Sequence, residues 1–141
     1  MSIYIAGPFF NEKQICFIED IENLFKVNRM PFYSPRSEGV LLDLDEEARQ
    51  KAKKAIYDTN VTRIKNCSIM VAVIDDRDTG TIWEMGYAAA LGKPIISISN
   101  ESYGLNVMLA ESVQAHVKNL EDLYIAIVDP EFKGELLGGV F

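Results

Sequence analysis

Carboxylate side chains gather where an apolar segment ends and a helical pattern begins. The segment Ser68–Ile74 is almost entirely apolar, and three acids follow it: Asp75, Asp76 and Asp78. A Thr-Gly turn comes next, and then a helix that we expect to carry Glu84 in its first turn. Two carboxylates, those of Asp78 and Glu84, would then face one cleft, with Arg77 as the only basic residue nearby. This grouping favours a small, largely uncharged ligand and chemistry that uses a carboxylate.

Glu84 allows two interpretations. The spacing Thr81-x-x-Glu84 fits a capping box, in which the glutamate only returns to the first amide of its own helix. Alternatively, the apolar neighbours Trp83, Met85 and Tyr87 bury Glu84 in part, and the helix N-terminus holds its carboxylate ionised. An ionised, partly desolvated carboxylate is a usable nucleophile.

Other candidates have structural alternatives as well. Asp78 is a turn or cap residue, or it faces the ligand as the acid nearest the helix. Asn60 falls on the helix stripe of Ile56, Tyr57, Val61 and Ile64, where an amide makes a core hydrogen bond or contacts a ligand. Tyr4 is a core residue or a site residue, and Phe9 with Phe10 could form an aromatic floor for a ring.

Composition narrows the classes of function. The 141-residue chain, 48% hydrophobic, suits one domain over residues 1–141. Its net charge of -7 disfavours nucleic-acid polymers as partners. Apolar runs are too short for a membrane span, and no signal peptide is recognisable, so we expect a cytoplasmic protein. We expect Cys16 and Cys67 to be core thiols. His116 is the only histidine, so no metal site is expected, and neither G-x-G-x-x-G nor a P-loop is present.

Hydrophobic periodicity predicts alternating strands and helices. Expected strands are residues 2–6, 30–34, 68–74, 94–99 and 114–117. Expected helices are one capped by Asn11, a long one from Asp43 or Asp45, and those at 79–91, 105–112 and 120–128, with a loop at 36–44. Such alternation predicts an α/β fold, a doubly wound, flavodoxin-like, five-stranded parallel sheet of order 2-1-3-4-5 with helices on both faces.

Four segments together resemble the nucleoside 2-deoxyribosyltransferase family. They are Y-I-A-G-P-F-F at 4–10, D-T-G-T-I-W-E-M-G-Y-A at 78–88, G-K-P at 92–94 and L-N-V-M at 105–108. The match covers nearly the whole chain in order. It implies a cofactor-free enzyme of nucleoside salvage that moves a 2-deoxyribosyl group between nucleobases by double displacement with retention, with hydrolysis as a side reaction.

The resemblance also implies roles for individual residues. Glu84 would attack C1′, Tyr4 would hydrogen-bond and orient it, and Asp78 would line the sugar site. Other substrate-binding residues would be Gly7, Phe10 and Asn60. Asn106 and Met108 would reach a neighbouring subunit's site in a dimer-based homo-oligomer, up to a hexamer, and the terminal carboxylate of Phe141 would enter the active site.

One position departs from the family. Asn60 stands where the family commonly has an aspartate that protonates the leaving base, and an amide cannot supply that proton. Asp78 or a bound water could substitute. Two alternatives to transfer stay open: N-glycosidase action on 2′-deoxynucleosides or their 5′-monophosphates, and a non-enzymatic nucleotide-sensing or receiver-like α/β domain.

Overall fold

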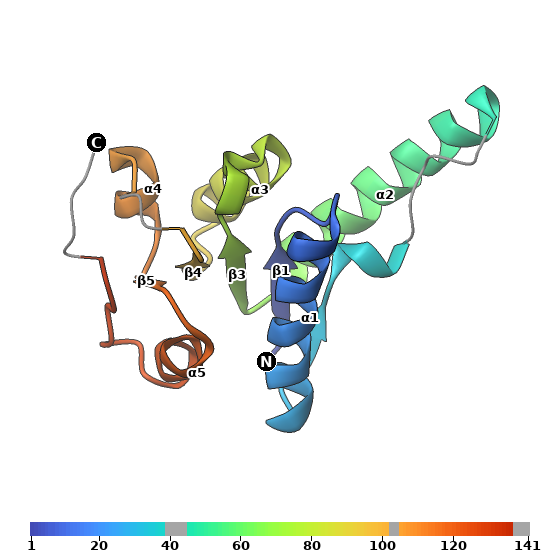
Figure 1. Cartoon of the computed structure of the whole chain (residues 1–141). Helices are drawn as coiled ribbons and strands as arrows, with labels where there is room; N and C mark the ends of the chain where they lie inside the picture. Colours follow the sequence, from blue (N-terminus) through green and yellow to red (C-terminus); the bar gives the residue numbers. More distant parts are fainter. Residues whose placement is uncertain (39–44, 102–104, 137–141) are drawn as a thin grey trace.

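The computed structural model describes residues 1–38, 45–101 and 105–136 of the chain. Strands and helices alternate along it (Figure 1). The strands are β1 (Ile3–Ala6), β2 (Phe32–Tyr33), β3 (Ile69–Val73), β4 (Ile95–Ile98) and β5 (Ala115–Val117). The α-helices are α1 (Glu12–Val27), α2 (Glu46–Asn66), α3 (Thr79–Ala90), α4 (Val107–Ser112) and α5 (Leu120–Val128), with short 3₁₀ turns at Pro35–Glu38 and Asp75–Arg77.

All five strands lie parallel in one sheet of order β2-β1-β3-β4-β5, which confirms the predicted doubly wound fold. From β1 the chain moves first to one side, to β2, and then returns past β1 to form β3 on the other side. In such sheets ligands bind beyond the carboxyl ends of the strands at this reversal. The loops after β1 and β3 are therefore the expected location of a site.

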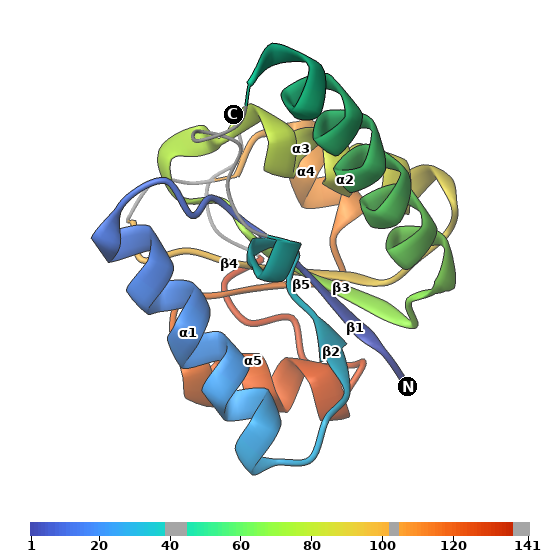
Figure 2. The same ribbon diagram turned by 90° about the vertical axis from the view of Figure 1, so that its right-hand side faces the viewer.

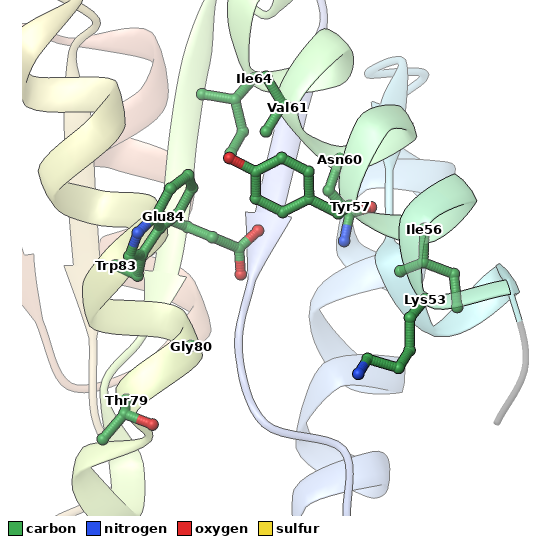
Figure 3. Close-up of a pocket in the computed structure, with 10 residues that line it drawn as sticks. All are labelled: Lys53, Ile56, Tyr57, Asn60, Val61, Ile64, Thr79, Gly80, Trp83 and Glu84. Atoms are coloured by element: carbon green, nitrogen blue, oxygen red, sulfur yellow. The ribbon is translucent and has the colours of Figure 1, made fainter. Parts of the chain in front are cut away.

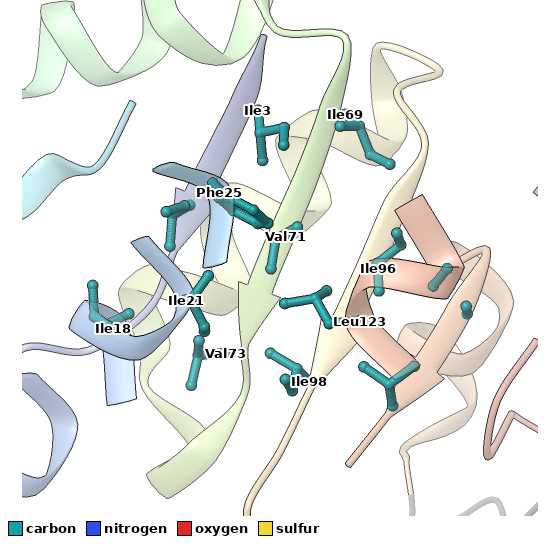
Figure 4. Packing of buried hydrophobic residues seen from close by; sticks show 14 residues of the cluster. Ile3, Ile18, Ile21, Phe25, Ile69, Val71, Val73, Ile96, Ile98 and Leu123 are labelled. Carbon is teal, nitrogen blue, oxygen red and sulfur yellow. The ribbon is translucent and has the colours of Figure 1, made fainter. Parts of the chain in front are cut away.

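Alternation along each strand divides the core between the two faces of the sheet. Helices α1 and α5 cover one face, and α2, α3 and α4 cover the other (Figure 2). Ile3 and Ile5 of β1 pack with Val71 and Val73 of β3 in the cluster that also contains Phe25 of α1 (Figure 4). Because side chains in a strand alternate, the residues between them point to the opposite face.

The opposite face positions Tyr4. This residue is fully buried, and it shares a cluster with Met70 and Ala72 of β3 and with Met85 and Ala88 of α3. Tyr33 of β2 is the register partner of Tyr4 across the β1–β2 ladder. The sequence pattern Ile-Tyr-Ile-Ala thus turns one large polar-tipped ring toward the helices that follow β2 and β3.

Helix α2 is long but weakly packed. Asp45 caps it by accepting a hydrogen bond from the Ala48 amide, as one of the two predicted starts requires. Ile64 is its one fully buried residue, and the N-terminal turns project from the body (Figure 1). Five charged pairs or polar bonds along its exposed surface join residues three or four apart, which supports a helix with little packing.

Two elements are shorter than predicted. Strand β2 keeps only two of the residues expected at 30–34, because Met30 N–H is bonded to Phe25 at the end of α1 and Pro35 begins a 3₁₀ turn. Helix α4 begins at Val107 rather than residue 105, because Asn106 caps it. Part of the loop expected at 36–44 is the 3₁₀ turn, and the remainder lies outside the described residues. None of the helices in the described ranges has the length and apolar character needed to span a membrane.

Candidate active site

A cavity of about 610 Å³ lies between α2 and α3, on the face of the sheet that carries Tyr4 (Figure 3). Its volume is in the range typical of small-molecule sites. Most of the described lining is apolar or aromatic, with a few polar groups among them. The lining residues are Lys53, Ile56, Tyr57, Asn60, Val61, Ile64, Thr79, Gly80, Trp83 and Glu84.

Glu84 projects from α3 into this cavity (Figure 3). The N-cap of α3 is Asp78, so Glu84 lies in the second helical turn, and its expected place in the first turn is wrong. The capping-box interpretation is wrong for the same reason, since Thr81 is inside the helix and does not cap it. The carboxylate of Glu84 instead accepts a short hydrogen bond from the Tyr4 hydroxyl.

Burial changes the titration of this pair. It raises the pKa of Glu84 to about 7, with a further rise from the nearby Asp78 charge, while the Tyr4 hydrogen bond opposes both. The prediction that the helix N-terminus holds Glu84 ionised is therefore wrong: desolvation outweighs a helix dipole whose effect fades beyond the first turn. Burial and the Glu84 charge raise the pKa of Tyr4 far above its ordinary value, so the phenol stays a donor.

Asp78 has a structural role at the start of α3. Its carboxylate accepts hydrogen bonds from the Thr81 amide at 2.9 Å and from the Thr81 hydroxyl at 2.8 Å. The 3₁₀ turn before it contains two left-handed residues, Asp76 with φ of 61° and Arg77 with φ of 51°. This turn directs the chain from β3 into α3 and so sets the position of Glu84.

Helix α2 forms the other wall of the cavity. Asn60 lies there with the stripe predicted for it, and Tyr33 donates a hydrogen bond to its Oδ1 at 3.4 Å. Aromatic rings join the two walls, with the centroids of Tyr57 and Trp83 5.8 Å apart. Sequence reasoning named Tyr57 and Trp83 only as apolar positions and did not identify Lys53.

Lys53 corrects the expectation that Arg77 is the only basic residue near the site. Extending the stripe of Asn60 by seven residues, two helical turns, leads to position 53, so this signal was present in the spacing. A cation at the rim changes the range of ligands that the cavity can accept.

Four predicted site residues lie elsewhere in this single chain. Phe10 is 76% exposed and stacks on Phe9, so the two do not form a floor among the described lining residues. Gly7 has a packing reason, because a Cβ there would lie 2.9 Å from Ile18 Cδ1. Asn106 caps α4, and Met108 beside it is 73% exposed. Phe141 lies outside the described residues.

The described part of the chain contains no group of three or more His, Cys, Asp or Glu residues placed to hold a metal ion. His116 is buried on β5, where its Nδ1 lies 2.8 Å from the Ser97 hydroxyl. It lies outside the cavity lining. The polar side chains of the described cavity include Glu84, which is bonded to Tyr4, as well as Asn60, Lys53 and Thr79.

A doubly wound sheet with a cavity and a buried carboxylate–phenol pair near its reversal point is typical of one class: α/β proteins with a small-molecule site. The model of the family described as nucleoside 2-deoxyribosyltransferase matches residues 3–121. The chain belongs to this family, and the resemblance in the sequence is confirmed.

Solved structures are similar to the chain over nearly its whole length. A 2-deoxyribosyltransferase from Bacillus psychrosaccharolyticus has a TM-score of 0.83 and 28% identity, and the match covers 95% of this chain and 98% of that one. A CMP N-glycosidase from Clostridium botulinum has a TM-score of 0.59 and 18% identity over 92% and 99%. A conserved protein from Enterococcus faecalis V583 has a TM-score of 0.57 and 21% identity, and the match covers 100% of this chain and 90% of that one.

The last two likenesses support the fold alone. The comparison with curated proteins found no match. Family membership and the first structure indicate an enzyme of the deoxyribosyltransferase kind, with nucleosides and bases as its substrates.

Proposed function

We propose that this protein transfers a 2-deoxyribosyl group from one nucleobase to another with retention, through a covalent intermediate on Glu84. The observation that carries the proposal is the Glu84 carboxylate facing a nucleoside-sized cavity and held by the Tyr4 hydroxyl. Ionised Glu84 attacks C1′ as the bond to the leaving base breaks, and the acceptor base then displaces the glutamate. Two inversions at C1′ give net retention, by the logic of retaining glycosidases.

Desolvation strengthens the effect of the Glu84 charge without abolishing the ionised form. A partly buried carboxylate stabilises the oxocarbenium-like transition state more strongly than an exposed one, because few waters screen its charge. Its pKa of about 7 leaves a large ionised fraction at neutral pH. The Tyr4 bond fixes which carboxylate oxygen is engaged and leaves the other oxygen for C1′.

The leaving base needs a proton from a group other than Asn60, because an amide does not donate one. Water entering the cavity can provide it. Asp78 is engaged with Thr81 and raises the pKa of Glu84, which places its negative charge close to the nucleophile. We infer that Asp78 shapes the sugar end of the site while solvent supplies the proton.

A neighbouring subunit would complete the site. Val107 is 48% exposed and Met108 73% exposed at the start of α4, beside the cap residue Asn106. Large apolar side chains left in water are typical of surfaces that pack in an oligomer. We propose that Asn106 and Met108 contact the 5′ end of the nucleoside bound by the partner.

A second candidate is hydrolysis of a 2′-deoxynucleoside 5′-monophosphate. Lys53 at the cavity favours it, because an ammonium group can bind a phosphate. Asp78 disfavours it, since an anion beside a desolvated phosphate costs several kcal/mol. We place free nucleosides before monophosphates for two reasons. The Asp78 charge is close enough to Glu84 to raise its pKa and would repel a phosphate, whereas the Lys53 ammonium group is exposed to water.

One incubation separates these activities. The enzyme is mixed with deoxyinosine or deoxyuridine and adenine, and the products are separated by chromatography. A new deoxyadenosine peak is the expected result, whereas free base without it means hydrolysis, and no change means binding only. Parallel reactions with deoxyinosine 5′-monophosphate test the second candidate, and Glu84→Gln is the control, expected to abolish both reactions.

A further inference from the structure

Tyr33 contacts both Tyr4, which holds Glu84, and Asn60. It is the register partner of Tyr4, and the two ring centroids are 5.8 Å apart. The guanidinium carbon of Arg63 lies 4.6 Å from the centroid of the Tyr33 ring. A guanidinium group over the face of an aromatic ring is attracted to that ring. The contacts of the Tyr33 ring with Tyr4 and Arg63 therefore hold the ring in place, and with it the hydroxyl.

The hydroxyl fixes the orientation of Asn60. Tyr33 Oη donates to Asn60 Oδ1 at 3.4 Å. At this length the bond is weak, so it biases the amide toward this orientation and adds little energy. An asparagine amide has one acceptor oxygen and a nitrogen with two donor hydrogens. With the oxygen engaged by Tyr33, the nitrogen is turned toward the space between α2 and α3, where Figure 3 shows it.

We propose that Tyr33 is a positioning residue that makes Asn60 a fixed hydrogen-bond donor to the nucleobase. The ligand class follows from this: bases that present an acceptor, either a ring nitrogen without hydrogen or a carbonyl oxygen, toward α2. This inference rests on the proposed function, because it concerns the base half of the same cavity. Without Tyr33 the amide could rotate by 180° and present its oxygen, which selects the opposite kind of base edge.

The test is a double-mutant cycle on binding of a free base, which needs no turnover. Isothermal calorimetry measures the Kd of adenine for wild type, Tyr33→Phe, Asn60→Ala and the double variant. Phenylalanine keeps the ring against Tyr4 and Arg63 and removes only the hydroxyl. We expect Tyr33→Phe to weaken binding about threefold to tenfold in wild type, the size of one hydrogen bond, and less than about twofold in the Asn60→Ala background.

Three analogues of adenine provide a second measurement that a purely structural role would not change. Each of 1-, 3- and 7-deazaadenine lacks one ring acceptor. We expect one of them to bind less tightly than adenine to wild type and to be insensitive to Tyr33→Phe.

Equal losses from Tyr33→Phe with adenine and all three analogues, additive losses in the cycle, or no measurable binding of adenine to wild type would each overturn the inference. Failure of the proposed function looks different: no transfer or hydrolysis, with the coupling between Tyr33 and Asn60 still present. Thermal melting of each variant shows that the measured losses come from folded protein.

Discussion

At the scale of single residues, the account rests on one carboxyl group held by one phenol. Glu84 is useful as a nucleophile only when ionised, while burial favours its neutral form. The Tyr4 hydroxyl opposes that effect by donating to the carboxylate. Burial therefore strengthens the electrostatic effect of the ionised Glu84 carboxylate, and the Tyr4 hydrogen bond keeps enough of that carboxylate ionised.

This balance predicts the pH dependence of activity. Because the pKa of Glu84 is about 7, kcat/KM for the nucleoside donor should fall as pH drops below about 7 and level off above it. Tyr4→Phe removes the bond that lowers this pKa, so the acidic limb should move to higher pH. Initial rates from pH 5 to 9 measure both curves, with Tyr124→Phe on α5 as the control. A limb that stays in place in Tyr4→Phe would contradict the coupling.

Several site residues could be read from the sequence, and others could not. Asn60 was predicted from its helical stripe, and that stripe is one wall of the cavity. Glu84 was placed one turn too early, because Asp78 rather than Thr81 caps α3 and a left-handed turn at Asp76 precedes it. Neither a competing cap nor a positive φ at a non-glycine residue has a strong local signature.

At the scale of elements, the fold followed from periodicity. Strands β3 and β4 are nearly continuous apolar runs, and Gly92, with φ of 72°, ends α3 as the Gly-then-Pro signal predicts. Strand β2 was overestimated because the Met30 amide bonds back to Phe25 of α1 and Pro35 begins a 3₁₀ turn. The long α2 was predicted from its cap and stripe, although Ile64 is its one fully buried residue.

An ion pair that the sequence did not suggest connects α1 to the turn after β2. Arg36 donates from Nε to Glu22 at 2.8 Å and from Nη2 at 2.6 Å, and the Glu22 side chain is only 7% exposed. Burial raises the pKa of Glu22, but the bonds from Arg36 and Ser34 outweigh it and lower the pKa overall. The pair spans fourteen residues, which is why no helical spacing revealed it.

We expect Arg36→Ala to lower the free energy of unfolding by about 1–3 kcal/mol at pH 7, because it leaves the Glu22 charge buried without its main partner. Because the pKa of Glu22 is lower in the folded than in the unfolded protein, its ionised form stabilises the fold at pH values above the unfolded-state pKa. This stabilisation is lost as the pH falls through the folded-state pKa. The effect of Arg36→Ala should therefore shrink below about pH 4. Urea unfolding at several pH values measures it, with Lys51→Ala as the exposed control, and equal stability of Arg36→Ala and wild type would contradict the role of the pair.

At the scale of the whole molecule, the site is open in a single chain. One wall is the projecting helix α2, and Tyr57 and Trp83 on the two walls are each about half exposed. Met108 on α4 is 73% exposed as well. Quaternary structure could not be predicted from periodicity, because a surface stripe that meets a partner has the same pattern as one that packs within the chain.

Mixing two inactive variants tests whether sites are shared between subunits. We expect Glu84→Gln and Asn106→Ala each to lose most activity. In a dimer that contains one of each, one site has both native residues, so remixing by mild denaturation and refolding should restore about a quarter of wild-type activity. Each variant taken alone through the same denaturation and refolding is the control, because neither one by itself can form a site with both native residues. Absence of recovery in the first mixture would show that Asn106 acts within its own chain or not at all.

The central claim is a covalent bond between a carboxylate of α3 and the anomeric carbon. A 2-fluoro-2-deoxynucleoside donor slows both steps and lets the intermediate accumulate, because fluorine destabilises the oxocarbenium-like transition state. Mass spectrometry of intact protein and of its peptides should show one fluorodeoxyribosyl group, located on Glu84 and released when adenine is added. An adduct on another residue, or full turnover with no adduct at any time, would contradict the account.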